Sequence, residues 1–254
     1  MSPLSLFDRA RLWLLIGIAA LAPRLAADVG NLPNEAWAKL PPHPRLLANA
    51  ARWQALKQQI RADATSAQIF ALVRANAESF LTAPPVAYVD TGAFLYGPMR
   101  QGQGRILALA LAYRIDGDLR FLAQARAEMK AMAALPNWYP QHFLDTGEAA
   151  LGMGLGFDWL HDDLTPAERD QFAAAIIEKG LRASWNADGT SPKWATANTN
   201  WNQVCHGGLV VGALAVAERE PALARRIVDR ALENVRHAAA GRILGGAYPE
   251  GPSY

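Results

Sequence analysis

Two short stretches of this sequence carry the residue types best suited to binding chemistry. One runs from Asn198 to Gly208 and the other from Gly245 to Tyr254. Each packs uncharged hydrogen-bonding groups, aromatic rings and glycines into a short window. Such windows suit a site that grips a polar, ring-shaped ligand.

Four side chains in these stretches could act directly on such a ligand. Asn200 or Asn202 can donate two N–H bonds without ionising. If residues 201–218 form one helix, Asn202 and His206 lie four positions apart on one face, near an N-terminus that favours an anion. Tyr254 can serve as an acid, or as a base when nearby positive charge lowers its pKa of about 10. The structural alternatives are Asn200 as a helix cap, and His206 and Tyr254 as packed core residues.

Four other residues need an interpretation. Trp194 and Trp201 either stack on sugar rings or pack between helices. Glu250 either lines the cleft and orients a neighbour, or makes a surface ion pair. Cys205 lies among apolar and small residues, which predicts a buried, inert thiol. No His, Cys and Asp cluster has metal-ligand spacing, so neither a metal nor another cofactor is expected.

Composition limits the function classes. Hydrophobic residues make up 51% of the 254 residues and charged residues 19%, so a sizeable core is available and disorder is not expected. The formal net charge is only +2, and no run of five Lys and Arg residues occurs, which argues against a nucleic-acid binder. The mild positive charge suits an acidic ligand in a local basic cleft.

The first 27 residues are typical of a secretory signal peptide. Arg9 and Arg11 precede an apolar run at 12–22, which is shorter than the about 20 residues that span a bilayer. Cleavage after Ala27 predicts a periplasmic or secreted protein with no stable membrane insertion. The alternative is an uncleaved anchor or a lipid-surface helix. A secreted chain with one cysteine cannot form an internal disulfide.

Residues 28–254 are predicted to form one domain that is almost entirely helical. Amphipathic helices are expected at 49–62 and 65–81. A pattern then occurs three times: an apolar inner helix, a short polar turn and an amphipathic outer helix. The expected pairs are 106–115 with 119–135, 149–160 with 167–181, and 209–218 with 222–240. Such hairpins predict an all-α fold, either an incomplete (α/α) toroid or a helical solenoid.

Six motifs along the chain carry a resemblance to a known family. They are His43-Pro44-Arg45-Leu46, Ala112-Tyr113-Arg114-Ile115-Asp116-Gly117-Asp118, Phe143-Leu144-Asp145-Thr146-Gly147-Glu148, Gly156-Phe157-Asp158-Trp159-Leu160, Asn200-Trp201-Asn202-Gln203-Val204-Cys205-His206-Gly207-Gly208 and Tyr248-Pro249-Glu250-Gly251-Pro252-Ser253-Tyr254. Their order and spacing resemble the heparinase II/III-like polysaccharide lyases, including oligoalginate lyases. That family joins an (α/α) toroid to an antiparallel β-sandwich. The resemblance therefore implies that this chain is the toroid, truncated at its C-terminal end, without the sandwich.

The resemblance also implies an activity. Family members cleave uronic-acid polysaccharides of the alginate or glycosaminoglycan type by β-elimination. Tyr254 matches the catalytic tyrosine, and Asn200 or Asn202 matches the asparagine that neutralises the substrate carboxylate. His206 is a second candidate, as a donor or a base. The expected partner is an acidic polysaccharide or oligosaccharide and not a nucleic acid. Three residues are expected to bind it: Trp194, Trp201 and Glu250.

Three other functions stay open. A glycoside hydrolase would need two carboxylates flanking the bond, for which Asp145, Glu148 and Asp158 are available. Asp145 is better interpreted as a helix start, and Asp158 as the partner of an arginine; His142 nearby is expected to be structural. The second alternative is a non-catalytic remnant that binds acidic carbohydrate. The third is a protein-binding solenoid, which leaves the Asn, His and Tyr groups unexplained.

Overall fold

The structure is a computed structural model that describes residues 32–88 and 96–242. Every regular element in these ranges is a helix, which confirms the all-α fold. The chain divides into two compact units, residues 1–40 and 41–254. The described part of the first unit contains one short helix, α2 (Asn34–Ala38).

The second unit carries the main helices and several short helical turns. The α-helices are α3 (Ala50–Ala62), α4 (Ala64–Ser79), α5 (Tyr96–Asp116), α6 (Leu119–Ala134), α7 (Leu144–Leu160), α8 (Pro166–Ala175), α9 (Asn200–Ala215) and α10 (Pro221–Arg242). The turns are η1 (Pro140–His142), η2 (His161–Asp163), the π-helical η3 (Ile176–Leu181), η4 (Arg182–Ser184) and η5 (Lys193–Thr196).

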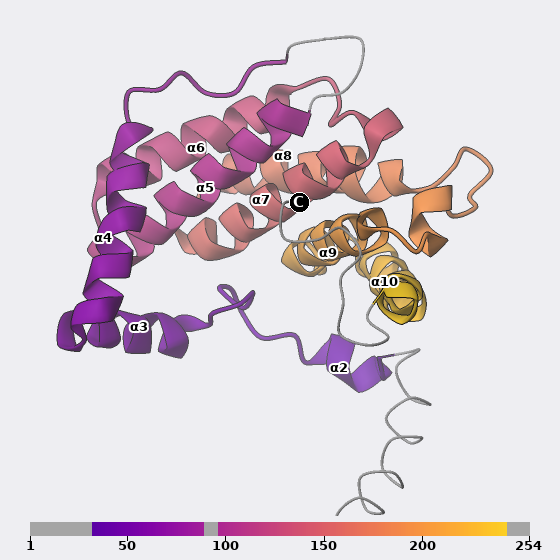
Figure 1. Cartoon of the computed structure of the whole chain (residues 1–254), viewed down its shortest axis with the longest axis horizontal. Coiled ribbons are helices and arrows are strands. Elements are labelled where there is room, and N and C mark those ends of the chain that lie inside the picture. The colour runs from indigo at the N-terminus through magenta and orange to yellow at the C-terminus, as the bar shows by residue number, and fades with distance from the viewer. Residues whose placement is uncertain (1–31, 89–95, 243–254) are drawn as a thin grey trace, which may run out of the picture. The chain divides into compact units, whose positions relative to one another are not determined.

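The last six α-helices form the three hairpins that the sequence predicts. They are α5 with α6, α7 with α8, and α9 with α10 (Figure 1). The inner helix α7 packs against both α5 and α9, and the outer helices α6 and α8 pack against each other. Helices α3 and α4 pack against each other and against α5. The hairpins therefore line up in chain order, with their first helices side by side.

All three inner helices begin earlier than the hairpin pattern predicts. Helix α5 begins at Tyr96, α7 at Leu144 and α9 at Asn200, where the hairpin pattern placed their starts at 106, 149 and 209. The added turns contain Gly97, Gly102 and Gly104 in α5, and polar and glycine residues in α9. Glycine disfavours a helix by about 1 kcal/mol relative to alanine, so the local pattern argues against these turns. Packing against the neighbouring helices overrides that preference.

Helix α7 is buried along nearly its whole length, as its apolar sequence predicts. Its glycines allow the backbone of α9 to approach closely. A Cβ placed on Gly208 of α9 would lie 2.0 Å from the carbonyl oxygen of Gly147 in α7. A Cβ on Gly154 would lie 3.0 Å from the Cα of Gly212. We call these four residues the glycine seam, because they set the distance between α7 and α9.

A capping box forms the start of α8. The backbone N–H of Glu168 donates to Thr165 Oγ1 at 3.3 Å, and that of Thr165 donates to Glu168 Oε2 at 3.0 Å. Glu168 also pairs with Arg126 and Lys130 of α6. Burial acts to raise the pKa of Glu168, but hydrogen bonds from Lys130, Thr165 and Arg126 outweigh it and lower the pKa to about 2. The Glu168 carboxylate thus caps the N-terminus of α8 and also holds α8 against α6 through ion pairs.

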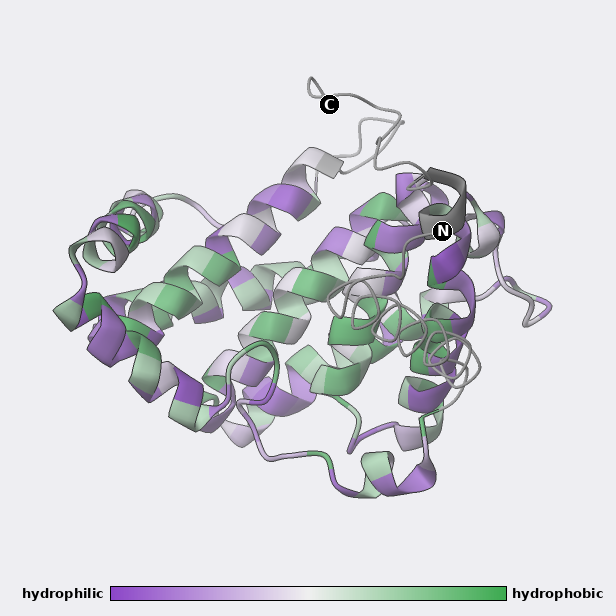
Figure 2. Ribbon diagram, turned by 60° about the horizontal axis from the view of Figure 1, so that its bottom comes forward, coloured by the Kyte–Doolittle hydropathy of each residue, from purple (hydrophilic) through white to green (hydrophobic). Residues whose placement is uncertain are grey.

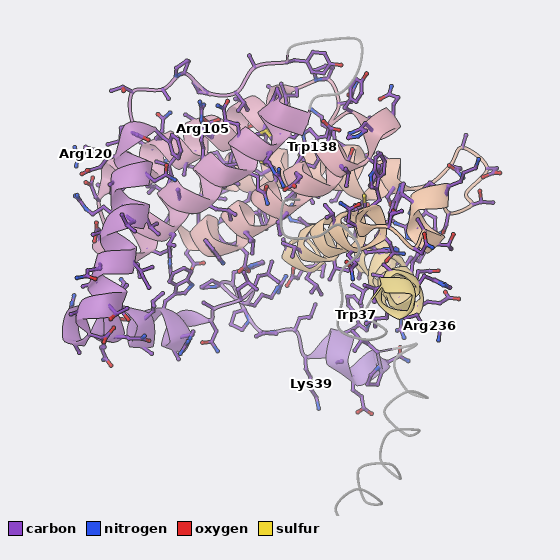
Figure 3. The ribbon with its side chains drawn as sticks, in the orientation of Figure 1. Trp37, Lys39, Arg105, Arg120, Trp138 and Arg236 are labelled. Carbon is purple, nitrogen blue, oxygen red and sulfur yellow. The ribbon has the colours of Figure 1, made fainter. Side chains whose placement is uncertain are left out.

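A buried ion pair joins α5 and α6 to the segment before them. Arg105 Nη1 lies 2.7 Å from Glu128 Oε1, and Glu128 is fully buried (Figure 3 labels Arg105). The other oxygen of Glu128 accepts from the N–H of Val86 at 3.0 Å, and Arg105 donates to Pro84 O at 2.7 Å. The pair therefore satisfies backbone groups of the non-helical segment as well as its own charges.

Asp158 of α7 fastens the start of the second unit. His43 Nδ1 donates to its Oδ1 at 2.6 Å, and the backbone N–H groups of Arg45 and Leu46 donate to the same carboxylate at 2.8–3.1 Å. The expectation that an arginine side chain pairs with Asp158 is wrong. The guanidinium of Arg45 instead pairs with Glu218, beyond the end of α9. Asp158 is thus an acceptor for a backbone turn.

The hydropathy of the residues differs between the helices at the centre of the second unit and those at its edge. In Figure 2 hydrophobic residues run along the helices at the centre of the second unit, and hydrophilic residues gather on those at its edge. None of the described helices combines the length and apolar content that crossing a bilayer requires. The apolar run at 12–22, and with it the predicted signal peptide at 1–27, lies outside the described residues.

Candidate functional site

The first turns of α9, which contain Asn200, lie at the centre of the candidate site. Thr199 has extended backbone angles (φ −106°, ψ 168°) and takes the N-cap position. Asn200 is therefore the first helical residue, and the alternative of Asn200 as the cap is wrong. The N–H groups of a first helical turn lack intrahelical partners, so half-buried Asn200 lies where an anion is favoured.

Asn202 and His206 lie on one face of α9, as their spacing predicts, and that face is turned into the protein. Asn202 is 0% exposed and His206 1% exposed. Asn202 Nδ2 and His206 Nε2 both donate to the carbonyl oxygen of Ala195 in η5, at 2.8 and 3.1 Å. Asn202 Nδ2 also donates to Asn234 O of α10 at 3.2 Å. These bonds hold η5 and α10 against α9, and they occupy the amide hydrogens of Asn202.

The His206 imidazole is neutral at neutral pH. Burial lowers its pKa to about 4; the hydrogen bond to Ala195 opposes this shift, and the positive charge of Arg230 adds to it. Because Nε2–H donates to Ala195, Nδ1 carries the lone pair, and it has no hydrogen-bond partner among the described residues. His206 therefore supports the site from beneath its surface.

Trp194 packs and also reaches the surface. Its ring stacks on Phe143, with centroids 4.7 Å apart and an interplanar angle of 19°, and it meets His206 edge-on at 5.1 Å. Only 8% of the residue is exposed. That exposed part lines both depressions described below. Packing is therefore confirmed for most of the ring, and stacking on a sugar stays a prediction.

Trp201 is half-exposed and contacts a histidine–carboxylate pair. Its ring meets that of His142 edge-on, with centroids 4.7 Å apart. His142 Nδ1 donates to Asp145, which is fully buried in the first turn of α7. A buried carboxylate on Nδ1 fixes the tautomer and the orientation of an imidazole. The pair therefore holds a defined ring edge against Trp201.

Two depressions meet at Trp194 and Trp201, and we call them together the tryptophan groove. The first is lined by Lys193, Trp194, Ala197, Thr199 and Trp201. The second is lined by Pro140, Gln141, Phe143, Ala183, Trp185, Asn186, Pro192, Trp194 and Trp201. The second measures ≈ 450 Å³, which lies within the range of about 300–1,000 Å³ that small-molecule sites occupy. None of these lining residues is acidic.

The sequence interpretation missed Trp185 and the arginines that contact it. Trp185 lines the second depression, and the guanidinium carbons of Arg230 and Arg226 lie 3.9 and 4.4 Å from its ring centroid. The two arginines are four positions apart on α10, so a shared helix face could be read from the sequence. Their tryptophan partner, about forty residues earlier, could not.

The three carboxylates considered for hydrolysis all have partners. Asp158 accepts from His43 and from two backbone N–H groups, Asp145 accepts from His142, and Glu148 lies 3.5 Å from Arg100. None of the three lines the tryptophan groove. The arrangement of two carboxylates across a sugar-binding groove, which hydrolysis requires, is therefore not formed by these residues.

Two predicted site residues, Glu250 and Tyr254, lie outside the described residues. Within residues 32–88 and 96–242, no group of three or more His, Cys, Asp or Glu side chains could hold a metal ion. Cys205 is buried, as predicted, and burial raises the pKa of its thiol far above the usual range.

Comparison of the sequence with models of protein families and with curated proteins finds no match.

Proposed function

We propose that this chain binds a uronic-acid-containing polysaccharide in the tryptophan groove and is the toroidal part of a lyase that cleaves it by β-elimination. The observation that carries the proposal is the groove, which Trp185, Trp194 and Trp201 line without any acidic residue among its described walls. Aromatic rings suit the apolar faces of sugars, and walls free of carboxylates suit a sugar that carries one.

The helical hairpins support the proposed architecture. The inner helices α5, α7 and α9 pack in chain order, as successive members of an (α/α) toroid would. In this proposal the described hairpins are part of an incomplete toroid. Removal of the signal peptide would release the chain to the periplasm or the exterior, where its acidic polysaccharide substrate is met.

The proposed reaction breaks the C4–O bond of the linkage. A base takes the C5 proton, the 4-oxygen leaves and takes up a proton, and a C4=C5 double bond remains. Asn200 is assigned to the substrate carboxylate, because it stands at the start of α9 while Asn202 gives its amide hydrogens to backbone oxygens. Tyr254 is assigned to proton transfer on the family resemblance alone.

The remaining predicted site residues are assigned to positioning or to substrate binding. Asn202 and His206 hold η5, and with it the Trp194 wall, through their shared bond to Ala195. They are positioning residues in this proposal. Glu250 remains a candidate for substrate binding from the C-terminal stretch.

An elimination assay tests the lyase. The purified chain is incubated with alginate, heparan sulfate and chondroitin, and ultraviolet absorbance of unsaturated uronide is followed beside reducing ends. We expect absorbance and reducing ends to rise together with one of these substrates, and to fall at least about a hundredfold in Asn200→Ala. Asn76→Ala, on the exposed face of α4, is the matched control. If reducing ends appeared without the ultraviolet absorbance, the chain would be a hydrolase and the proposal of a lyase would be wrong.

The second candidate is a non-catalytic binder of acidic carbohydrate. It is favoured because Asn202 and His206 donate their hydrogen bonds to backbone oxygens within the protein. The aromatic groove is then the feature that best supports a function, and that function is binding. Binding of an acidic oligosaccharide without either product in the same assay would select it.

A further inference from the structure

Two positive charges meet on one ring at the wall of the tryptophan groove. The guanidinium groups of Arg226 and Arg230 lie over Trp185, which lines the second depression. Arg230 also lies over Trp194, with 5.3 Å between its guanidinium carbon and the ring centroid. The arginines of α10 are thereby joined to two of the three tryptophans of the groove.

Neither arginine has a carboxylate partner in the described part of the chain. Arg230 is 5% exposed and donates only to Ser184, through Nη1 to the carbonyl oxygen and through Nη2 to Oγ, each at 2.8 Å. Its buried Nε finds no acceptor among the described residues. Arg226 is exposed and takes part in no ion pair within those residues. The ring faces compensate only part of this charge.

Five other arginines of the second unit behave differently. They pair with acidic side chains at 2.7–2.8 Å: Arg74 with Asp116, Arg105 with Glu128, Arg126 with Glu168, Arg182 with Glu220 and Arg219 with Asp170. The groove also carries Lys193 in its first depression and no acid among its described walls. Its positive charge is therefore a local property, in a chain whose net charge is only +2.

Arg230 remains charged despite its burial. Burial lowers its pKa to about 10, and the like charge of Arg226 adds to the shift. The Arg230 guanidinium is therefore cationic at neutral pH, and an anion placed beside it would offset the repulsion between the two arginines. A guanidinium presents a planar fork of N–H groups that matches a carboxylate, which makes a carboxylate-bearing ring a fitting occupant.

We infer that the second depression of the tryptophan groove is a subsite for a carboxylate-bearing sugar. Arg226, which contacts the lining residue Trp185 and is not itself among the lining residues, is assigned to bind the carboxylate at the edge of the depression, and Arg230 positions Trp185 and Trp194. The inference rests on the proposed function, and it adds a subsite on the α10 side of the groove, apart from Asn200. The subsite accepts an acidic sugar residue and discriminates against a neutral one.

Isothermal titration of the full chain tests the subsite. The probes are oligosaccharides of mannuronate and of heparosan, each beside its carboxyl-reduced counterpart, in which every carboxylate has become an alcohol. We expect at least one acidic probe to bind, its reduced form to bind at least tenfold more weakly, and Arg226→Gln to weaken acidic binding by about tenfold. The variant should bind the reduced form as the parent does.

The matched control is Arg236→Gln. It removes the same charge from the same helix, and Arg236 lies at the outer side of α10 (Figure 3). Its affinity should stay within about twofold of the parent's, because long-range charge effects of a single surface residue are screened. A second variant, Arg230→Lys, keeps the charge and removes the planar group, and it should weaken both probe forms by disturbing the tryptophan walls.

The outcomes separate the subsite from the proposed function. Acidic binding that Arg226→Gln leaves unchanged, or that Arg236→Gln weakens equally, would overturn the subsite while the proposed function stands. Equal binding of acidic and reduced probes would overturn the assigned preference for a carboxylate. Binding of no probe would overturn the acidic-carbohydrate function and the subsite together.

Discussion

At the scale of single residues, the buried imidazole of His206 couples stability to pH. Its pKa is about 4 in the folded chain and 6.5 in an exposed histidine, so the unfolded chain takes up the proton first as pH falls. The contribution of His206 is complete above about pH 6.5 and is lost as pH falls toward 4. At roughly 1.4 kcal/mol per pH unit, the loss approaches about 3 kcal/mol.

His206→Gln should remove that part of the pH dependence. The free energy of unfolding, from urea titrations at pH 7 and pH 4.5, should fall more steeply for the parent chain than for the variant. Carboxylates such as Glu168 contribute equally to both chains and cancel in the comparison. Equal slopes would mean that His206 is protonated within the folded chain without cost.

The fate of single polar groups was only partly predictable. The burial of Cys205 followed from its apolar and small neighbours, because such neighbours face a core. The acceptors of Asn202 were not predictable, since Ala195 and Asn234 belong to other elements and meet it only in the folded chain. The alternative of Asn200 as the cap stayed open in the sequence because Thr199 and Asn200 are both capping residue types, and only the backbone angles decide between them.

At the scale of elements, the glycine seam offers a comparison between adjacent residues. Gly208→Ala would place a methyl group 2.0 Å from the backbone oxygen of Gly147, so α7 and α9 must separate. Gly207→Ala meets nothing within 4 Å and lies on an exposed part of the same helix. We expect the first change to lower the free energy of unfolding by about 3 kcal/mol or more. The second should raise it by about 0.5–1 kcal/mol.

Chemical denaturation followed by circular dichroism measures both variants. The two substitutions change the same residue type by the same group in neighbouring positions of α9, so each serves as the control of the other. A similar response of both would show that the close approach of α7 and α9 does not limit stability.

Helices were predictable where their own sequence favours them. Helices α3, α4, α6 and α10 have residue patterns that a helix satisfies locally, and their observed bounds lie close to the predicted ones. The first turns of α5, α7 and α9 depend on contacts with other helices, so the hairpin pattern missed them. The passage of α8 into the π-helical η3 has no local signal that we recognise in the sequence.

At the scale of the whole second unit, Asp158 joins parts of the chain that lie more than a hundred residues apart. It accepts from His43, Arg45 and Leu46, and the Arg45 guanidinium continues the link to Glu218. Asp158→Asn would turn N–H groups toward donors that need an acceptor. We expect it to lower the free energy of unfolding by about 2–4 kcal/mol.

Asp162→Asn is the natural control, because Asp162 is a neighbouring carboxylate that also faces a histidine. Its side chain is 73% exposed and lies 3.3 Å from His161, so its loss should cost no more than about 0.5 kcal/mol. Thermal and urea unfolding of both variants measure the difference. If the two variants lost equal stability, the turn at residues 43–46 would be held by other contacts.

The arrangement of the hairpins was predictable in part at this scale. Alternating apolar and amphipathic helices indicated which helix of each hairpin lies inside, because only a buried helix can be apolar all round. The tryptophan groove was not predictable as a surface. Its walls come from η1, the loop after η4, η5 and α9, and the distances among these elements depend on the packing of α7, α9 and α10.

The glycine seam also bears on the order in which the chain folds. Helix α7 has 17 residues and carries Gly147, Gly152, Gly154 and Gly156. Helices of that length are marginal in water, and each glycine costs roughly 1 kcal/mol more. The most buried helix therefore cannot form ahead of its neighbours. Helices without glycine, such as α6 and α8, can form first, and the centre of the protein becomes helical only when α9 closes upon it.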